Sequence, residues 1–211
     1  MRKIPYFPSL VCLLLLLSSC STSSAFSTDA PLQRAGQRPV ALRFGMHVTP
    51  DPKTNPIDPP ERFEGYHAAL DFETFAEELE SDVPVYAICD GEVYFSGFAA
   101  GYGGLLVQRC TISGESVTVI YGHLDGGDEL VKKGTVLYAG DPLGKLADPH
   151  SHWSDGNRKH LHLGIHRGDK IDERGYVQAE AELAEFLDPA TVLPFGATGK
   201  VVEKFHVPIM K

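Results

Sequence analysis

The sequence has 211 residues, of which 43% are hydrophobic and 22% charged, and it carries a formal net charge of −9. These totals are typical of one globular domain with a leader or tail, and they exclude a coiled coil, a collagen and a wholly disordered chain. The acidic excess makes nucleic acid a poor partner, because phosphate-binding domains are normally basic. No apolar stretch reaches the roughly 20 residues that a membrane-spanning helix needs.

The chain begins like a secreted protein, with two basic residues followed by a leucine-rich run. Leu17-Ser18-Ser19-Cys20 then resembles the lipobox of bacterial lipoproteins, in which the cysteine receives a lipid and becomes the first residue. We therefore expect a lipoprotein signal peptide over residues 1–19 and a flexible tether over residues 20–38. The resemblance implies a lipid-anchored envelope protein, with Ser21 favouring the periplasmic face of the outer membrane. The alternative is an ordinary signal peptide with an incidental cysteine.

Residues 39–195 are expected to form the folded domain, followed by a tail over residues 196–211. The domain begins with residues 39–62, a short apolar piece followed by a proline-rich loop, and short apolar runs separated by turns follow this segment. This spacing favours an antiparallel sheet or sandwich, with hairpin turns at Asp90-Gly91 and Ser113-Gly114. The expected strands cover residues 83–89, 92–96, 104–110, 116–121, 135–139 and 160–166.

Two segments suggest helix. Residues 180–187 predict one short helix that ends before Asp188-Pro189, because the residue before a proline disfavours helical geometry. Residues 67–79 also contain helix-forming residues, and local propensity alone favours helix there, although tertiary context often overrides propensity.

Two cysteines, Cys89 and Cys110, lie in the expected domain, within neighbouring strand-like runs. An exported compartment permits a disulfide between them. Two buried free thiols are the alternative.

Histidines carry most of the chemical signal. In the alternating segment 160–166, a strand would place His160, His162 and His166 on one face and the apolar residues on the core face. A His-x-His pair on a strand is a candidate metal-binding motif, although two exposed strand histidines would give the same pattern.

His67 and Asp71 are four residues apart, about 13 Å along a straight strand, so only a helix or a bent strand could bring both to one metal ion. A salt-bridging aspartate beside a surface histidine is the alternative interpretation. Together with His162, however, the set would contain two imidazoles and one carboxylate. Such a set leaves a fourth position on zinc open, as in hydrolytic sites.

With these motifs in this order, the chain resembles the lysostaphin-like, LytM-type zinc endopeptidases that cut peptidoglycan peptides. The resemblance runs from about residue 44 to residue 193. It rests on an ordered series of motifs: Phe44-Gly45-Met46-His47, Tyr66-His67-Ala68-Ala69-Leu70-Asp71-Phe72, Val83-Pro84-Val85-Tyr86-Ala87, Gly101-Tyr102-Gly103-Gly104, Tyr121-Gly122-His123-Leu124 and His160-Leu161-His162-Leu163.

The resemblance implies a mainly β, antiparallel fold of the LytM type, with a substrate groove and one zinc ion per chain. Carried over by motif, the zinc ligands would be His67, Asp71 and His162, and the catalytic histidines would be His123 and His160. The fold would also make residues 67–71 a bend leading into a strand, which we favour over the local helix.

Two departures from the family pattern stand out. Ala69 replaces the glycine usual two positions after the first ligand, and a longer segment, 148–159, precedes the second histidine motif. That segment could border the groove, with Trp153 supplying contact area, or be a variable surface loop.

The leading hypothesis is therefore a zinc endopeptidase that cleaves peptidoglycan stem peptides or cross-links. One alternative is a non-cleaving, LytM-like envelope protein that binds or activates another cell-wall hydrolase as a regulator. Another is a zinc peptidase that cuts a protein substrate.

Overall fold

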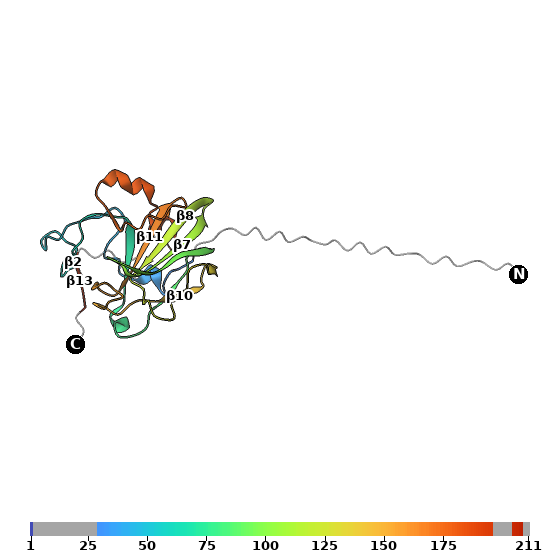
Figure 1. The fold of residues 1–211 in the computed structure, drawn as a ribbon, viewed down its shortest axis with the longest axis horizontal. Coiled ribbons are helices and arrows are strands. Elements are labelled where there is room, and N and C mark those ends of the chain that lie inside the picture. Colours follow the sequence, from blue (N-terminus) through green and yellow to red (C-terminus); the bar gives the residue numbers. More distant parts are fainter. Residues whose placement is uncertain (2–28, 196–203, 209–211) are drawn as a thin grey trace.

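The computed structural model describes Met1, residues 29–195 and residues 204–208. At its centre is an antiparallel six-stranded sheet in the order β4-β11-β8-β7-β6-β9 (Figure 1). Its strands are β4 (Ala69–Glu73), β6 (Gly91–Ala99), β7 (Gly103–Ile112), β8 (Glu115–Gly122), β9 (Val136–Leu137) and β11 (His160–Arg167). The expected mainly β, antiparallel fold is confirmed.

Three small sheets surround this one, with the orders β1-β3-β12, β10-β5 and β13-β2. Their strands are β1 (His47–Val48), β2 (Ile57–Asp58), β3 (Gly65–His67), β5 (Pro84–Tyr86), β10 (Pro142–Lys145), β12 (Tyr176–Val177) and β13 (Phe205–His206). Short 3-10 helices cover residues Ala35–Gln37, Ala76–Glu78 and Glu180–Glu185.

The alternation in β11 is confirmed. Leu161, Leu163 and Ile165 are completely buried in the main hydrophobic core. The intervening histidines point to the opposite face, where loops and small sheets cover them as well, so that β11 is buried on both faces.

One of the two expected hairpins forms. Ser113 and Gly114 have φ values of 51° and 82°, which suit a two-residue turn between β7 and β8. The hairpin expected at Asp90-Gly91 is wrong, because β5 pairs with β10 and β6 pairs with β7. Neither of those two residues has the positive φ that such a turn would need.

The segment from His67 to Asp71 is a bent strand, and the helix that local propensity favours there does not form. The chain leaves β3 at His67, turns at Ala68 and continues as β4. The amide of His67 donates to the carbonyl of Met46, whereas the amide of Asp71 donates to the carbonyl of Leu42. Pairing with two different partner segments therefore outweighs the helix propensity of this sequence.

The helix predicted at 180–187 also needs correction. Residues Glu180–Glu185 form a 3-10 helix, and the one short α-helix of the described chain, α1 (Pro189–Val192), begins where we expected a helix to end. Asp188 caps α1 by accepting a hydrogen bond from the Ala190 amide at 2.9 Å. A proline is favourable at the first helical position, so Asp188-Pro189 starts a helix.

The folded domain begins earlier than expected. Residues 29–38, which we assigned to the tether, pack on the domain, since Leu32 and Ala35 enter the main core and Arg38 is completely buried. At the other end, β13 lies within the expected tail and pairs in parallel with β2, as Figure 1 shows at one edge of the molecule. The predicted signal peptide, Cys20 and residues 20–28 lie outside the described residues.

Within the described part of the chain, no helix is long and apolar enough to cross a membrane.

Cys89 and Cys110, which are 21 positions apart in the sequence, are joined by a disulfide. Both side chains are buried, Cys89 after β5 and Cys110 on β7. The bond therefore ties the segment that follows β5 to β7, an inner strand of the main sheet.

Replacing both cysteines, Cys89→Ala with Cys110→Ala, is expected to lower the free energy of unfolding by about 3 kcal/mol, because a cross-link over a loop of this length restricts the unfolded chain. Denaturant titration measures this. A reducing agent should destabilise the wild-type chain by a similar amount and leave the double variant unchanged. Equal stability of variant and oxidised wild type would contradict the prediction.

Candidate metal centre

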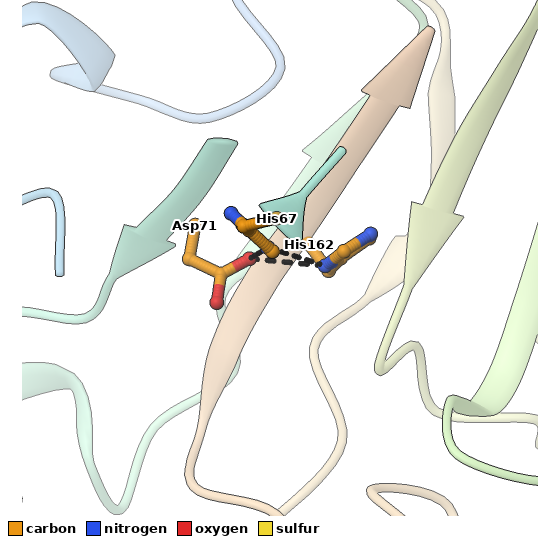
Figure 2. Close-up of side chains that lie close together, drawn as sticks. All are labelled: His67, Asp71 and His162. Carbon is orange, nitrogen blue, oxygen red and sulfur yellow. Dashed lines mark hydrogen bonds and ion pairs between the residues drawn. The ribbon is translucent and has the colours of Figure 1, made fainter. Parts of the chain in front are cut away.

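Three of the predicted site residues converge at the junction of β3, β4 and β11. His67 ends β3, Asp71 lies on β4, and His162 lies opposite Asp71 in the β11–β4 register. Figure 2 shows the three side chains pointing at one another. Asp71 Oδ1 lies 3.2 Å from His67 Nε2 and 3.0 Å from His162 Nδ1, and the two nitrogens are 3.3 Å apart.

These distances fit one zinc ion. A tetrahedral ion with ligands at about 2.0–2.1 Å requires ligand atoms about 3.3 Å from one another. All three side chains are buried, and Asp71 Oδ1 has no hydrogen-bond donor. Two imidazole nitrogens and one carboxylate oxygen are a suitable donor set, and three protein ligands leave a fourth position free.

Neighbouring groups hold these ligands in place. The Nδ1–H of His67 donates to the carbonyl of Arg43 at 3.3 Å, which leaves Nε2 to face the metal position. The second oxygen of Asp71, Oδ2, accepts from Arg158 Nη2 at 3.0 Å. The metal-facing atoms are therefore fixed by partners outside the proposed ligand set.

Arg158 and two carboxylates complete a buried cluster that the sequence analysis missed. Besides Asp71, Arg158 binds Glu73 through Nε and Nη2 and Glu61 through Nη1. The strand alternation could have revealed part of it, because Arg158 precedes His160 by two residues and Glu73 follows Asp71 by two. Glu61 lies in the proline-rich segment, far away in sequence, and gave no such signal.

His123 and His160 lie beside the three predicted ligands. Their rings are 4.3 Å apart between centroids, and His160 Nε2 is 3.3 Å from Asp71 Oδ2. The Nδ1–H of His160 donates to the carbonyl of Arg158 at 3.0 Å. Nδ1 of His123 is buried and has no hydrogen-bond partner. The structure thus brings all five predicted metal and catalytic residues into one cluster.

Burial controls the charges of this cluster. It lowers the pKa of His160 to about 4, helped by the positive charge of Arg158, and it lowers the pKa of His123 well below the usual value. Both rings are therefore neutral at pH 7. Burial opposes ionisation of Asp71, but the neighbouring His67 and His160 rings lower its pKa well below the usual range.

The buried carboxylates outnumber the buried cation beside them. Asp71, Glu73 and Glu61 share one guanidinium, and burial together with the charge of Asp71 raises the pKa of Glu73 well above its usual value. The raised pKa of Glu73 reflects this crowding of carboxylates, which a cation bound at Asp71 would relieve.

A cavity of about 310 Å³ opens over the cluster. Its lining includes four of the clustered residues together with aromatic and acidic side chains. The four are Asp71, His123, His160 and His162. The lining includes Glu61, Phe63, Glu64, Tyr102, Asn157, Glu173, Tyr176 and Gln178. Such a cavity could hold a short stretch of peptide over the candidate metal position.

The remaining histidines lie elsewhere. His47 is exposed on β1 and packs against the Tyr66 ring, and His152 stacks on Phe98. His166 is 6% exposed and lies 3.7 Å from Asp172. The segment 148–159 supplies Asn157 to the cavity wall, whereas Trp153 lies outside the lining and contacts Phe98.

The family model described as Peptidase family M23 matches residues 65–173, just over half of the chain and all five of the clustered residues. No curated protein matches this sequence.

Several solved structures are similar to this chain at low sequence identity. The structure of cbpa from L. salivarius REN is 24% identical, covers 79% of this chain and 94% of its own, and has a TM-score of 0.50. Csd3 from Helicobacter pylori is 21% identical over 73% of this chain and 34% of its own, with a TM-score of 0.45. The antimicrobial peptidase lysostaphin from Staphylococcus simulans is 17% identical over 79% of this chain and 52% of its own, with a TM-score of 0.48. The match thus spans about a third of Csd3 and half of lysostaphin.

Gly122, opposite His162 in the β11–β8 register, leaves no room for a side chain. A Cβ there would lie 2.6 Å from the Tyr102 ring and 3.2 Å from His162 Cβ. Gly122→Ala is therefore expected to lower the free energy of unfolding by about 1–3 kcal/mol through overpacking. Denaturant titration checks this against Gly127→Ala, where the new Cβ would meet only Asp125 Oδ1 at 3.6 Å. Equal losses in both variants would contradict the prediction.

Proposed function

Because the chain belongs to peptidase family M23, we propose that it is a zinc-dependent endopeptidase that hydrolyses peptide bonds in peptidoglycan stem peptides or cross-links. The observation that carries the proposal is the near-equilateral triangle of His67 Nε2, Asp71 Oδ1 and His162 Nδ1, with edges of 3.0–3.3 Å, beneath an open cavity. Family M23 supports a peptidase of the cell envelope, and it also contains inactive members, so the complete site matters for the proposal.

His67, Asp71 and His162 would hold the zinc ion. When bound, zinc acidifies water and polarises the carbonyl of the scissile bond. Two of these side chains are held by other groups, His67 by a backbone carbonyl and Asp71 by Arg158. These partners would hold the ligand atoms of His67 and Asp71 in fixed directions.

His160 and His123 would move the protons. His160 lies against Asp71, and its neutral ring is placed to orient the attacking water and accept its proton. His123, which lines the cavity beside His160, would stabilise the oxyanion or protonate the departing amine. The close approach of the two rings would allow them to act on opposite sides of one peptide bond.

The substrate assignment rests on the family and on the shape and charge of the cavity. Its lining contains the carboxylates of Glu61, Glu64 and Glu173. These would attract the ammonium groups that stem peptides carry. The volume of about 310 Å³ would suit a few peptide residues.

We further propose that a lipid on Cys20 holds the enzyme at the envelope, on the periplasmic face of the outer membrane. Leu17-Ser18-Ser19-Cys20 supports this assignment. Asp29, whose amide donates to the carbonyl of Ile88, follows Cys20 by nine positions, so even a fully extended chain between the two spans no more than about 30 Å. The domain would therefore act close to the membrane that anchors it.

Chelation is expected to abolish the release of fragments from purified sacculi, and one equivalent of zinc should restore it. His162→Ala should fail to retain zinc and stay inactive, because it removes one of three protein ligands. Metal analysis and fragment chromatography measure both effects. His206→Ala, an exposed histidine paired with Asp58, is the matched control and should keep one zinc ion. Full activity of the metal-free wild type would contradict the proposal.

His123→Ala is expected to keep one zinc ion and to lose about 10²–10⁴-fold in the rate of peptide cleavage, the usual contribution of a general acid or base. His150→Ala, outside the cavity lining, should cleave at the wild-type rate. Wild-type speed in His123→Ala would show that the assignment is wrong. A wild-type chain that binds zinc and sacculi without releasing fragments would favour the non-cleaving regulator.

A further inference from the structure

We propose that Arg158 is a positioning residue that orients Asp71 for metal binding and links the metal centre to the proline-rich segment through Glu61. The inference rests on the proposed function only in taking zinc as the ion. It concerns the three contacts that one buried guanidinium makes, to Asp71, Glu73 and Glu61. Of these three residues, only Asp71 is a proposed zinc ligand.

The first contact determines which oxygen of Asp71 faces the metal. Arg158 Nη2 donates to Oδ2 at 3.0 Å, and Oδ1, which has no donor, faces both imidazoles. If Oδ2 were free, the carboxylate could rotate about its χ2 and present either oxygen or both. The guanidinium therefore favours binding through a single oxygen in a fixed direction.

The second contact fixes the guanidinium itself. Its Nε lies 3.0 Å from Glu73 Oε2, and its Nη2 lies 2.7 Å from Glu73 Oε1, a forked arrangement that suits the planar geometries of both groups. Glu73 is 1% exposed and lies on β4 two residues beyond Asp71. One strand thus provides both the metal ligand and the anchor of the group that orients it.

The third contact reaches the proline-rich segment. Arg158 Nη1 pairs with Glu61, whose second oxygen accepts from the Tyr176 hydroxyl at 2.9 Å. Glu61 and Tyr176 both line the cavity, and a Glu61 carboxylate oxygen lies within 4.8 Å of ligand atoms of Asp71 and His160. The same guanidinium that orients the ligand therefore also holds one wall of the cavity.

Lysine could not replace these contacts. Its single ammonium group would satisfy the charge requirement but could not donate along three directions in one plane. Arg158 is 4% exposed, so no water can readily take over the missing hydrogen bonds. Arg158→Lys thus separates the geometric role from the charge.

The experiment measures metal affinity in the absence of substrate. Zinc dissociation constants of the full-length chain are determined by competition with a chromogenic chelator for wild type, Arg158→Lys, Arg158→Gln and Arg174→Lys. Arg174 is the matched control, because it also binds three carboxylates, of Asp172, Glu182 and Glu185, none of which is a proposed zinc ligand. The visible spectrum of the Co²⁺-substituted chain reports on ligand geometry in each variant.

We expect Arg158→Lys to weaken zinc binding 10–100-fold, the usual effect of losing an orienting partner of a metal ligand. Its Co²⁺ spectrum should change, whereas Arg174→Lys should retain the wild-type affinity within twofold and the wild-type spectrum. Arg158→Gln should bind zinc more weakly than Arg158→Lys; if it does not fold, Arg158→Lys alone decides.

An affinity of Arg158→Lys within twofold of wild type, an unchanged Co²⁺ spectrum, or an equal loss in Arg174→Lys would overturn the inference. A wild-type chain that binds zinc but cleaves nothing would end the proposed function and leave the role of Arg158 intact. A wild-type chain that binds no zinc would overturn both.

Discussion

The carboxylate of Asp71 is the group on which the rest of the centre depends. One oxygen faces two imidazoles, and the other accepts from Arg158 and lies against His160. A carboxylate that is almost completely buried persists only when its charge is compensated. The surrounding residues provide that compensation asymmetrically, with a permanent cation on one side and a set of donor atoms suited to a metal ion on the other. The chemistry of the site follows from this asymmetry.

The sheet makes such a concentration of polar groups possible. β4 and β11 are neighbours, and their register places Asp71 opposite His162 and Glu73 opposite His160. The opposite face of β11 carries Leu161 and Leu163, which are buried in the main core. Apolar burial on one face therefore fixes the positions of the polar groups on the other, and the backbone hydrogen bonds of the ladder give the site its rigidity.

Segments near or beyond the ends of the expected domain also contribute to the structure. Residues 29–38 pack on the core, which shortens the chain between the candidate lipid anchor and the domain. The proline-rich segment contributes Glu61, and β13 pairs with this segment at β2. The proline-rich segment thus links the metal centre, through Glu61, to strand β13, through β2. No periodic sequence pattern predicts these contacts.

The sequence by itself determined the antiparallel class and the inward face of β11, because period-two alternation is a local signal. The five clustered residues were named through motifs that resemble those of a known family. It could not decide between helix and bent strand at His67–Asp71, since that choice depends on pairing with Met46 and Leu42. It also misplaced the partner of β5 and the start of α1. Only the tertiary structure brought Arg158, Glu73 and Glu61 around Asp71. Such a cluster forms because charges buried far from water must find partners, and the chain positions that meet this requirement are separated by up to 97 residues, a distance over which no local pattern carries information.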